Sequence, residues 1–296
     1  MNIFYKVLKH IALAFSHLPL RVLYVFSDFT YFLMYYVVRY RQKVVRKNLE
    51  IAFPHKTEVE RRDIEKRFYR HFSDYIFETA KSMTIPIEEL MKRMVITNTE
   101  EVNKFTDEGR SVFVYAAHFG NWEWFITWPY YFKAEKIQTF YKPQRNPLAD
   151  DLTLHSRKRF NIVAVPSRHG FRHMVSSVRR GEKSVTLIIG DQAPSGGAKK
   201  YWTNLFGRDT DFLLGSTTIA SKLNLVLFFP YFKKYRRGYY EVEMRLLEVD
   251  PAHHTDAQMI DRFAAMLEDN IRELPELWLW SHRRWKHRHE DFPDEQ

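Results

Sequence analysis

From about residue 93 onward, the chain alternates short apolar runs with segments of helical periodicity. Runs rich in β-branched and aromatic residues predict strands, and apolar positions that recur every three or four residues predict helices. This alternation is typical of an α/β protein with a mixed, mostly parallel central sheet flanked by helices. The expected strands are 94–97, 111–117, 137–141, 162–165, 184–189, 225–232 and 239–248. The expected helices are 99–108, 121–133, 147–160, 170–180, 212–222 and 255–273.

Two further patterns complete the expected topology. The last two strands are separated only by a turn near Arg237-Gly238, which predicts an antiparallel hairpin at one edge of the sheet. Residues 57–84 carry apolar side chains at every fourth position, and Thr57 and Glu60 have capping-box spacing, so a packed amphipathic helix is expected there. We therefore divide the chain into an N-terminal segment at 1–48, a helical segment at 49–92 and an α/β domain at 93–296.

The N-terminal segment contains a long, mostly apolar stretch at 11–38. A helix of that length, at about 1.5 Å per residue, crosses a hydrocarbon core of about 30 Å, and the many aromatic residues suit a membrane interface. Arg21 and Asp28 interrupt the stretch, but they lie on one helix face and are able to pair. We expect a membrane-anchor helix that spans or half-enters the bilayer. The alternative is a core helix hairpin, broken near Pro19, in a soluble protein.

Basic residues gather directly after the apolar stretch, whereas only Lys6 and Lys9 precede it. An excess of Lys and Arg marks the cytoplasmic side of a membrane segment, so the main domain is expected in the cytoplasm. The same charges would contact anionic headgroups; the alternative is an ordinary solvated helix turn. These residues are Arg39, Arg41, Lys43, Arg46 and Lys47.

Composition narrows the possible chemistry. The 296 residues carry a formal net charge of +10, which favours an anionic partner such as nucleic acid, anionic lipid or an acidic protein. The chain has no cysteine, which excludes disulfides, thiol nucleophiles and zinc–thiolate sites.

The stretch VFVYAAHFGNWEWF, at 112–125, places its polar residues where a buried strand ends. His118 follows the strand, and Gly120-Asn121 suits a turn into a helix that contains Glu123. In open α/β sheets, ligands bind at such strand ends. A neutral imidazole there is able to take a proton from a hydroxyl, and a carboxylate bonded to its other nitrogen stabilises the imidazolium. Free N–H groups near Gly120-Asn121 would stabilise an oxyanion or a phosphate.

The H-x4-E spacing is weak evidence by itself, because two other His and acid pairs share it in polar contexts. The alternative interpretation of His118 and Glu123 is a buried structural pair. A metal site formed by His118, Glu123 and Asp191 is disfavoured, because no second imidazole lies at ligand spacing. We therefore expect no metal and no cofactor.

Further polar residues follow other expected strands. Lys142 ends one strand, and Arg157 and Arg159 follow in the next helix, where a guanidinium suits phosphate or carboxylate. The alternative for them is a solvated helix face. Asp191-Gln192 ends the strand VTLIIGD and would orient His118, position an acceptor or cap the following loop.

The densest basic cluster contains Arg283 and Arg284 and is interleaved with tryptophans. It suits nucleic acid, a membrane surface or an anionic glycolipid. Its structural alternative is a packed terminal strand with a solvated tail.

Several blocks, in order, resemble the late acyltransferases of bacterial lipid A biosynthesis. HFGNWE resembles the His-x4-Asp/Glu motif of that family. The other similar blocks are RQKVVRKNLEIAFP, YKPQRNPLADD, GEKSVTLIIGDQ, NLFGR and LWLWSHRRWK, and together they span roughly 39–290. One departure is that Trp285-Lys286 continues into His287, where the family usually has Arg-Pro.

The resemblance implies an acyltransferase that moves a fatty acyl chain from a thioester, with acyl carrier protein as donor, to a hydroxyl of a lipid A precursor. It implies His118 as general base, Glu123 as the group that orients it, and Arg159 as the best match to the family's arginine, with Arg157 close. The expected substrate-binding residues are Asn121, Lys142, Arg157, Arg159, Asp191, Gln192, Arg283 and Arg284.

The implied partners are acyl carrier protein, an anionic glycolipid and a membrane, without nucleic acid. The implied location is the bacterial inner membrane, with the catalytic domain on its cytoplasmic face. Two alternatives remain open: an acyltransferase with a glycerolipid or aminolipid acceptor, and a non-enzymatic basic module that binds nucleic acid at the membrane.

Overall fold

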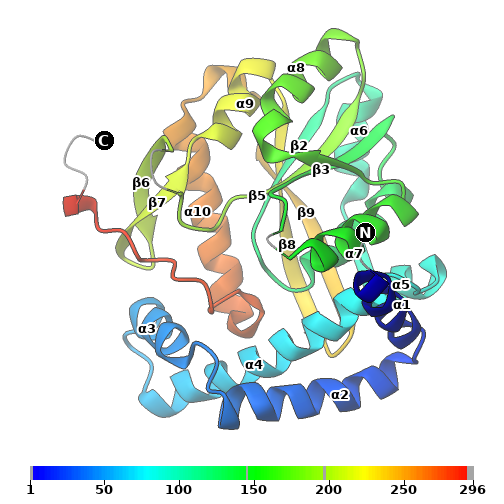
Figure 1. Ribbon diagram of the computed structural model, residues 1–296. Helices are drawn as coiled ribbons and strands as arrows, with labels where there is room; N and C mark the ends of the chain where they lie inside the picture. The colour runs from blue at the N-terminus through cyan, green and yellow to red at the C-terminus, as the bar shows by residue number, and fades with distance from the viewer. Residues whose placement is uncertain (1–2, 145, 196–197, 292–296) are drawn as a thin grey trace.

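The computed structural model describes residues 3–291, except residues 145 and 196–197 (Figure 1). Its α-helices are α1 (Ile3–Ser16), α2 (Leu20–Phe32), α3 (Gln42–Ala52), α4 (Glu58–Lys81), α5 (Ile87–Arg93), α6 (Thr99–Asp107), α7 (Pro147–Arg159), α8 (Gly170–Arg179), α9 (Gly215–Leu223) and α10 (Asp256–Glu273). Its strands are β1 (Met94–Thr97), β2 (Val112–Ala116), β3 (Lys136–Tyr141), β4 (Val163–Pro166), β5 (Ser184–Ile189), β6 (Lys200–Leu205), β7 (Arg208–Leu213), β8 (Val226–Arg236) and β9 (Tyr239–Glu248).

The central sheet has seven strands in the order β1-β9-β8-β2-β5-β3-β4. All neighbouring pairs are parallel except β8 and β9, so the predicted mixed, mostly parallel sheet is confirmed. The predicted position of the hairpin is wrong, because β1 adds to the outer side of β9 in parallel. A four-residue strand after a short helix is enough to cover that free edge.

Helices cover both faces of the sheet. Phe228 and Phe229 are neighbours in β8, so their side chains point to opposite faces. Phe228 contacts Phe105 of α6 and Phe229 contacts Phe263 of α10, which places these two helices on opposite faces. Strand β2 between these layers is buried at all five positions, as its unbroken apolar sequence predicts.

Two local predictions differ from the structure. The segment expected as an α-helix at 121–133 is a 3₁₀ helix, η2 (Trp122–Tyr130), which contains Pro129. Proline cannot donate a backbone hydrogen bond and clashes with the preceding turn, so a regular α-helix is not maintained.

The hairpin β6–β7 was not predicted, and because of it α9 begins at Gly215 instead of residue 212. Its two-residue turn has positive φ at Phe206 and Gly207, as such a turn requires.

The predicted capping box is present at the start of α4. The Thr57 hydroxyl accepts from the Glu60 N–H at 3.3 Å, and the Glu60 carboxylate accepts from the Thr57 N–H at 2.7 Å. This long helix runs beneath the sheet in Figure 1 and packs against α2.

The N-terminal apolar stretch forms two helices instead of one. No single helix in the described part of the chain is long and apolar enough to cross a membrane; Val7–Ser16 and Leu20–Val37 pass that test only together, across a bend of 114°. A single membrane-anchor helix is therefore not confirmed. Asp28 does not pair with Arg21 but with Arg237 of the β8–β9 turn, at 2.6 Å, because α2 packs with that side toward the domain.

Candidate active site

Three neighbouring parallel strands bring polar residues to one edge of the sheet. His118 lies just beyond β2, Asp191 and Gln192 just beyond β5, and Lys142 just beyond β3. Strand β5 pairs with both β2 and β3, and parallel strands end on the same side. This arrangement agrees with the expectation from the sequence that these strand ends line one crevice.

Asp191 is the residue that holds the imidazole. Its Oδ1 lies 2.7 Å from Nδ1 of His118, and its Oδ2 accepts from Nε1 of Trp278 at 2.8 Å. The Gln192 amide nitrogen lies 3.3 Å from Nε2 of His118. An amide nitrogen only donates and a carboxylate only accepts, so this network places the proton on Nδ1 and makes Nε2, which accepts from the Gln192 amide, the basic nitrogen of the ring.

Asp191 is 2% exposed, yet it stays ionised. Burial raises the pKa of its carboxyl, but the neighbouring His118 and the hydrogen bonds from His118 and Trp278 outweigh that effect, and the pKa lies below its ordinary value. A buried carboxylate beside an imidazole is the arrangement that stabilises an imidazolium.

The turn after β2 is held by the C-terminal part of the chain. The Gly120 N–H donates to the Leu277 carbonyl at 2.9 Å, and the Leu279 N–H donates to the His118 carbonyl at 3.1 Å. The Gly120 N–H is therefore already used, against the expectation that it would receive an oxyanion. Gly120 has φ +58°, and a Cβ there would lie 2.2 Å from the Phe232 ring, so the turn needs glycine.

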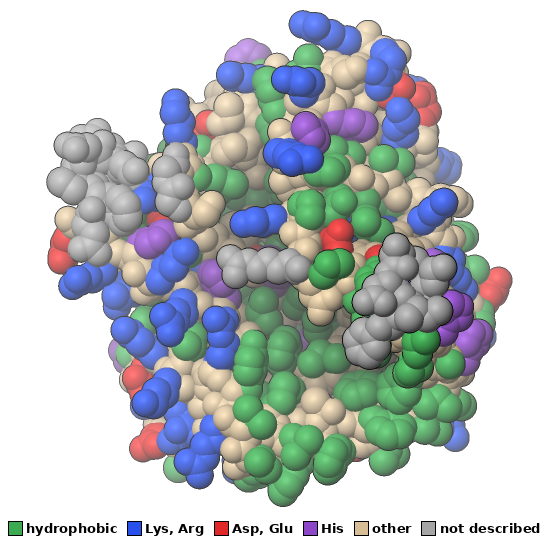
Figure 2. Space-filling model, in the orientation of Figure 1, with side chains coloured by type: hydrophobic (Ala, Val, Ile, Leu, Met, Phe, Trp, Pro, Cys, Tyr) green, Lys and Arg blue, Asp and Glu red, His purple; other side chains and the backbone are tan. Residues whose placement is uncertain are grey.

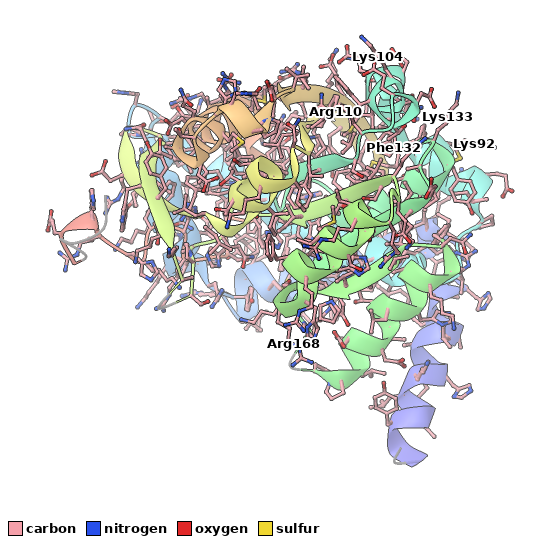
Figure 3. The ribbon with its side chains drawn as sticks, turned by 90° about the horizontal axis from the view of Figure 1, so that it is seen from above. Lys92, Lys104, Arg110, Phe132, Lys133 and Arg168 are labelled. Atoms are coloured by element: carbon pink, nitrogen blue, oxygen red, sulfur yellow. The ribbon has the colours of Figure 1, made fainter. Side chains whose placement is uncertain are left out.

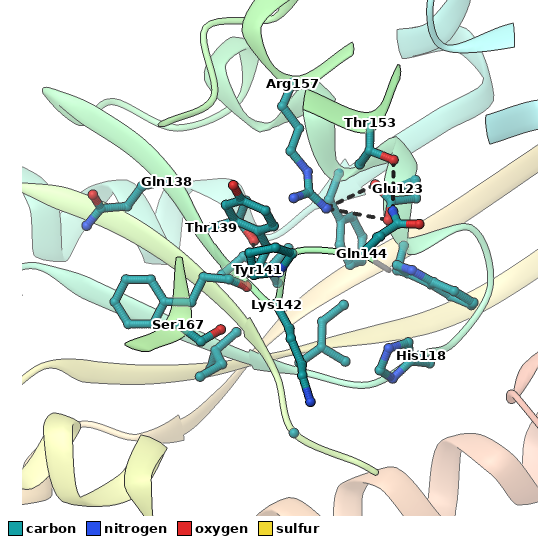
Figure 4. Close-up of a pocket in the computed structure, with 18 of the residues that line it drawn as sticks. His118, Glu123, Gln138, Thr139, Tyr141, Lys142, Gln144, Thr153, Arg157 and Ser167 are labelled. Atoms are coloured by element: carbon teal, nitrogen blue, oxygen red, sulfur yellow. Dashed lines mark hydrogen bonds and ion pairs between the residues drawn. The ribbon is translucent and has the colours of Figure 1, made fainter. Parts of the chain in front are cut away.

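A cavity of about 1030 Å³ opens beside His118 (Figure 4). Its wall has an apolar part and a polar part. The apolar part includes Trp122, Phe125, Ile126, Trp128, Ile137, Phe140 and Leu187, and the polar part includes His118, Glu123, Lys142, Arg157 and Gln192. Apolar walls with a few converging polar groups are typical of ligand sites.

Glu123 does not contact His118 as the spacing suggested. Its carboxylate pairs with Nη2 of Arg157 at 3.3 Å, the contact drawn in Figure 4, and within the described residues no hydrogen bond joins it to His118. In Figure 4 this side chain lies beside Thr153 and Arg157, which both belong to α7. The expectation that Glu123 orients the imidazole is therefore corrected: Asp191, distant in sequence, has that position.

The other predicted site residues separate into two groups. Lys142, Arg157 and Gln192 line the cavity, whereas Arg159 is exposed and donates to the Ser82 carbonyl at 3.2 Å. Asn121 is fully buried behind the turn and does not line the cavity. The structure therefore does not place Asn121 at the cavity, and of the two arginines Arg157, not Arg159, lines it.

The C-terminal arginines also lie outside the cavity. Arg284 is 1% exposed and donates to Asp211 at 3.1 Å, so it ties the C-terminal segment to β7. Arg283 is exposed. The structural alternative, a packed terminal segment, describes Arg284 better than substrate binding does.

Two residues near His118 had no assignment from the sequence. Trp278 anchors Asp191, and His282 accepts from the Ala193 N–H at 3.1 Å through Nε2. Burial lowers the pKa of His282 to about 4, so it stays neutral in that acceptor role. The block LWLWSHRRWK drew attention to both residues, but no local spacing connects them to Asp191.

Positive charge is spread over the molecule, with only part of it at the cavity. Arg168 lines the cavity, and in the view from above it lies on the opposite side of the molecule from Lys104 and Lys133 (Figure 3). In the described residues, no group of three or more His, Cys, Asp and Glu side chains is placed to hold a metal ion. The arrangement is suited to proton transfer at Nε2 beside an anionic, partly apolar ligand.

Comparison with known proteins agrees with this chemistry. The model of the family described as bacterial lipid A biosynthesis acyltransferase matches residues 5–287. A lipid A biosynthesis acyltransferase of Haemophilus influenzae is 25% identical over 239 residues, covering 79% of this chain and 72% of that protein. A lipid A biosynthesis lauroyltransferase of Escherichia coli is 24% identical over 260 residues, covering 86% and 81%. A palmitoleoyltransferase of lipid A biosynthesis in Escherichia coli is 21% identical over 249 residues, covering 84% and 79%.

Proposed function

Because this chain belongs to the bacterial lipid A biosynthesis acyltransferase family, we propose that it moves a fatty acyl chain from acyl carrier protein to a hydroxyl of a lipid A precursor. The names of two similar proteins, a lauroyltransferase and a palmitoleoyltransferase, support a long apolar donor chain. The net charge of +10 suits an acidic carrier protein and a phosphorylated acceptor.

His118 is the general base of the proposed reaction. Its Nε2 takes the proton of the acceptor hydroxyl while the oxygen attacks the thioester carbon. The C–O ester bond forms, the C–S bond breaks, and the leaving thiolate receives the proton from Nε2. Asp191 keeps the Nδ1 proton in place and stabilises the imidazolium between these steps.

Arg157, Lys142 and Glu123 serve the acceptor in this proposal. A guanidinium binds phosphate or a sugar carboxylate with paired hydrogen bonds, and Lys142 adds a second cation to the same cavity. Glu123 holds Arg157 in the wall through their 3.3 Å ion pair. The apolar wall formed by Phe125, Trp128 and their neighbours receives the acyl chain.

We further propose that α2 lies on the cytoplasmic face of the bacterial inner membrane. Large apolar side chains of α2 and the following turn remain exposed, with Val25 at 67% and Phe29 at 60%. Hydrophobic side chains gather along the lower edge of the molecule, where α2 runs, and Lys and Arg side chains gather beside them over α3 (Figures 1 and 2). An apolar face bordered by basic residues fits an anionic membrane surface.

The observation that carries the proposal is the His118–Asp191 pair, 2.7 Å apart, with Nε2 facing a cavity with an apolar wall. The test is mass spectrometry of lipid A from cells with the protein, without it, and with only His118→Ala. We expect one acyl chain to be missing in the last two. Normal lipid A with loss of an acyl group from another lipid would move the proposal to a glycerolipid or aminolipid acceptor.

A purified assay identifies the donor. The wild-type protein is given the same acyl group on acyl carrier protein or on coenzyme A, with a lipid A precursor in mixed micelles. Transfer from the carrier protein at a clearly higher kcat/KM supports the proposed donor. Equal use of both thioesters would contradict it.

A further inference from the structure

Glu78 is a fully buried carboxylate in α4 on which three hydrogen-bond donors converge. The Tyr24 hydroxyl donates to its Oε1 at 2.9 Å, and the Asn121 amide and Tyr240 hydroxyl donate to its Oε2 at 2.8 and 2.7 Å. These donors come from three separate parts of the chain: α2, the turn after β2, and β9. Glu78 therefore joins three elements at one point.

One of these parts is the turn that carries the proposed chemistry. Asn121 lies between His118 and Glu123, is buried, and faces away from the cavity. Helix α4 contacts the same segment twice more, since Nε2 of His71 lies 3.2 Å from the Gly120 carbonyl and Nε1 of Trp124 donates to the Glu78 carbonyl at 3.1 Å. The turn is thus held on one side by α4, while His118 lines the cavity on the other.

Another of these parts is the helix with the exposed apolar face. Tyr24 and Ser27 lie on the inner side of α2, where Ser27 donates to Asp74 of α4 at 2.6 Å. Val25 and Phe29 lie on the outer side. The Glu78 carboxyl group therefore connects Tyr24, on the inner side of α2, to the Asn121 amide through one hydrogen bond to each.

We propose that Glu78 is a positioning residue for the acyl-transfer reaction, and that it fixes the turn carrying His118 relative to α2. It touches no substrate; it acts through Asn121. This inference rests on the proposed function, because it explains how the membrane-facing helix and the catalytic turn keep one relative position. A displacement of about 1 Å at a catalytic group costs up to about 10²-fold in rate, so such a support is functionally significant.

A carboxyl group suits this point better than an amide. All three partners donate, and in the ionised form the two oxygens of Glu78 accept all three hydrogen bonds. A glutamine in its place has one acceptor oxygen and an NH₂ group that faces donors, so at least one hydrogen bond is lost or its partner must turn. In a buried network, such a mismatch is costly.

Glu65 provides a matched control on the same helix. It is also fully buried and accepts hydrogen bonds from two side chains, Arg46 at 3.1 Å and Arg62 at 3.1 Å, but neither belongs to the catalytic turn. Ser27 provides the equivalent control for Tyr24, because its hydrogen bond also joins α2 to α4 without reaching Asn121. A purely structural role predicts the same behaviour for each variant and its control.

The experiment measures kcat, the KM of each substrate and the Tm of four full-length variants: Glu78→Gln, Glu65→Gln, Tyr24→Phe and Ser27→Ala. We expect kcat to fall about tenfold or more in Glu78→Gln, and less in Tyr24→Phe, because a misplaced base slows chemistry. Both KM values should stay close to wild type, because Glu78 and Tyr24 do not line the cavity. Glu65→Gln and Ser27→Ala should lower Tm and keep kcat per folded molecule.

Equal kcat in Glu78→Gln and Glu65→Gln, at matched folded fractions, would overturn the inference. A second readout separates this outcome from a failure of the proposed function. The His118 ring resonances, assigned with His118→Gln in histidine-labelled protein, should shift in Glu78→Gln and stay in place in Glu65→Gln. If wild-type protein transfers no acyl group, the proposed function fails, and these resonances still decide whether Glu78 positions the turn.

Discussion

At the scale of single residues, the identity of the carboxylate beside His118 decides the chemistry. Asp191 is hydrogen-bonded to Nδ1 at 2.7 Å, whereas Glu123 is hydrogen-bonded to Arg157 in the cavity wall. The two acids therefore make different contacts, although Glu123 lines the same cavity as His118. Local spacing pointed to Glu123 for the Nδ1 contact, whereas Asp191, which follows a neighbouring strand and was also a candidate for orienting His118, makes it.

Substitution of each acid by its amide distinguishes these tasks. Asp191→Asn should lower kcat by about 10²–10⁴-fold, because the amide no longer fixes the tautomer or stabilises the imidazolium. Glu123→Gln should cause a much smaller loss of kcat and a higher acceptor KM. Steady-state kinetics of the two folded variants checks this. A larger kcat loss in Glu123→Gln would return Glu123 to the role of orienting group.

The two neighbouring arginines of α7 make a second comparison. Arg157→Ala should raise the acceptor KM by about 10- to 100-fold, because a hydrogen bond to a charged group contributes about 1.5–3 kcal/mol. Arg159→Ala is the control and should leave both KM values unchanged, since Arg159 lies outside the cavity. Titration of acceptor and donor in both variants provides the test. A higher acceptor KM in Arg159→Ala, with an unchanged acceptor KM in Arg157→Ala, would show that Arg159 turns inward in the working enzyme.

The Glu78 carboxyl should make folding stability depend on pH. Burial raises its pKa from 4.5 to about 7, despite the hydrogen bonds from Tyr240, Asn121 and Tyr24. Between these values the folded protein holds a proton that the unfolded chain releases, so rising pH favours unfolding. The free energy of unfolding of wild type, compared with that of Glu78→Gln, should therefore fall as the pH rises from 4.5 to about 7. The expected fall is of order 3 kcal/mol, because each unit of pKa shift corresponds to about 1.4 kcal/mol. Urea unfolding of both proteins across this range measures the difference, and a constant difference would contradict the raised pKa.

At the scale of elements, the sequence predicted those structures that depend on local pattern. The strands of the central sheet and most helices follow from apolar runs and helical periodicity, and the capping box at Thr57 is present. Elements that depend on tertiary contacts were not predictable. The hairpin β6–β7 has a weak alternating pattern, and its strands pair only with each other in the described residues.

The candidate site also combines features that follow from local sequence pattern with features that depend on tertiary contacts. The position of His118 at a strand end could be predicted, because strand and turn signals are local. Its bond to Asp191 depends on β5 being the neighbour of β2, and the support from Leu277, Trp278 and Leu279 depends on how the C-terminal segment returns to the sheet. Neither relation leaves a spacing signal in one sequence.

The outer face of α2 should determine membrane affinity without determining the fold. Val25→Ser and Phe29→Ser together should lower binding to anionic vesicles by tenfold or more, since each large apolar side chain contributes up to about 1.5–3 kcal/mol when buried. Tm should change little, because both side chains are exposed. Vesicle sedimentation measures the binding.

Leu23→Ser on the same helix is the matched control. Leu23 is 0% exposed, so this change should lower Tm while the outer face keeps its apolar residues. Unchanged vesicle binding in the Val25 and Phe29 double variant would place the membrane contact elsewhere on the protein.

At the scale of the whole molecule, the surplus of positive charge should act on the rate of encounter with an acidic donor protein. The KM for acyl carrier protein should rise with salt, because the Debye length falls from about 10 Å at 0.1 M to about 3 Å at 1 M. The KM for a short neutral acyl thioester, used as the control, should remain nearly constant. Parallel kinetics over this salt range checks the prediction, and equal salt dependence of both donors would exclude electrostatic steering.

The backbone contacts between the turn that carries His118 and residues 277–279 can form only late in synthesis of the chain. A ribosome releases the chain from its N-terminus, so α2 and its apolar face leave the ribosome long before the segment that pairs with Phe119 and anchors Asp191. The proposed membrane contact of α2 would therefore be available before the His118 imidazole has its full set of supporting contacts. A chain that stops before residue 277 would keep the apolar face of α2 and lack the contacts that hold the His118 turn and Asp191.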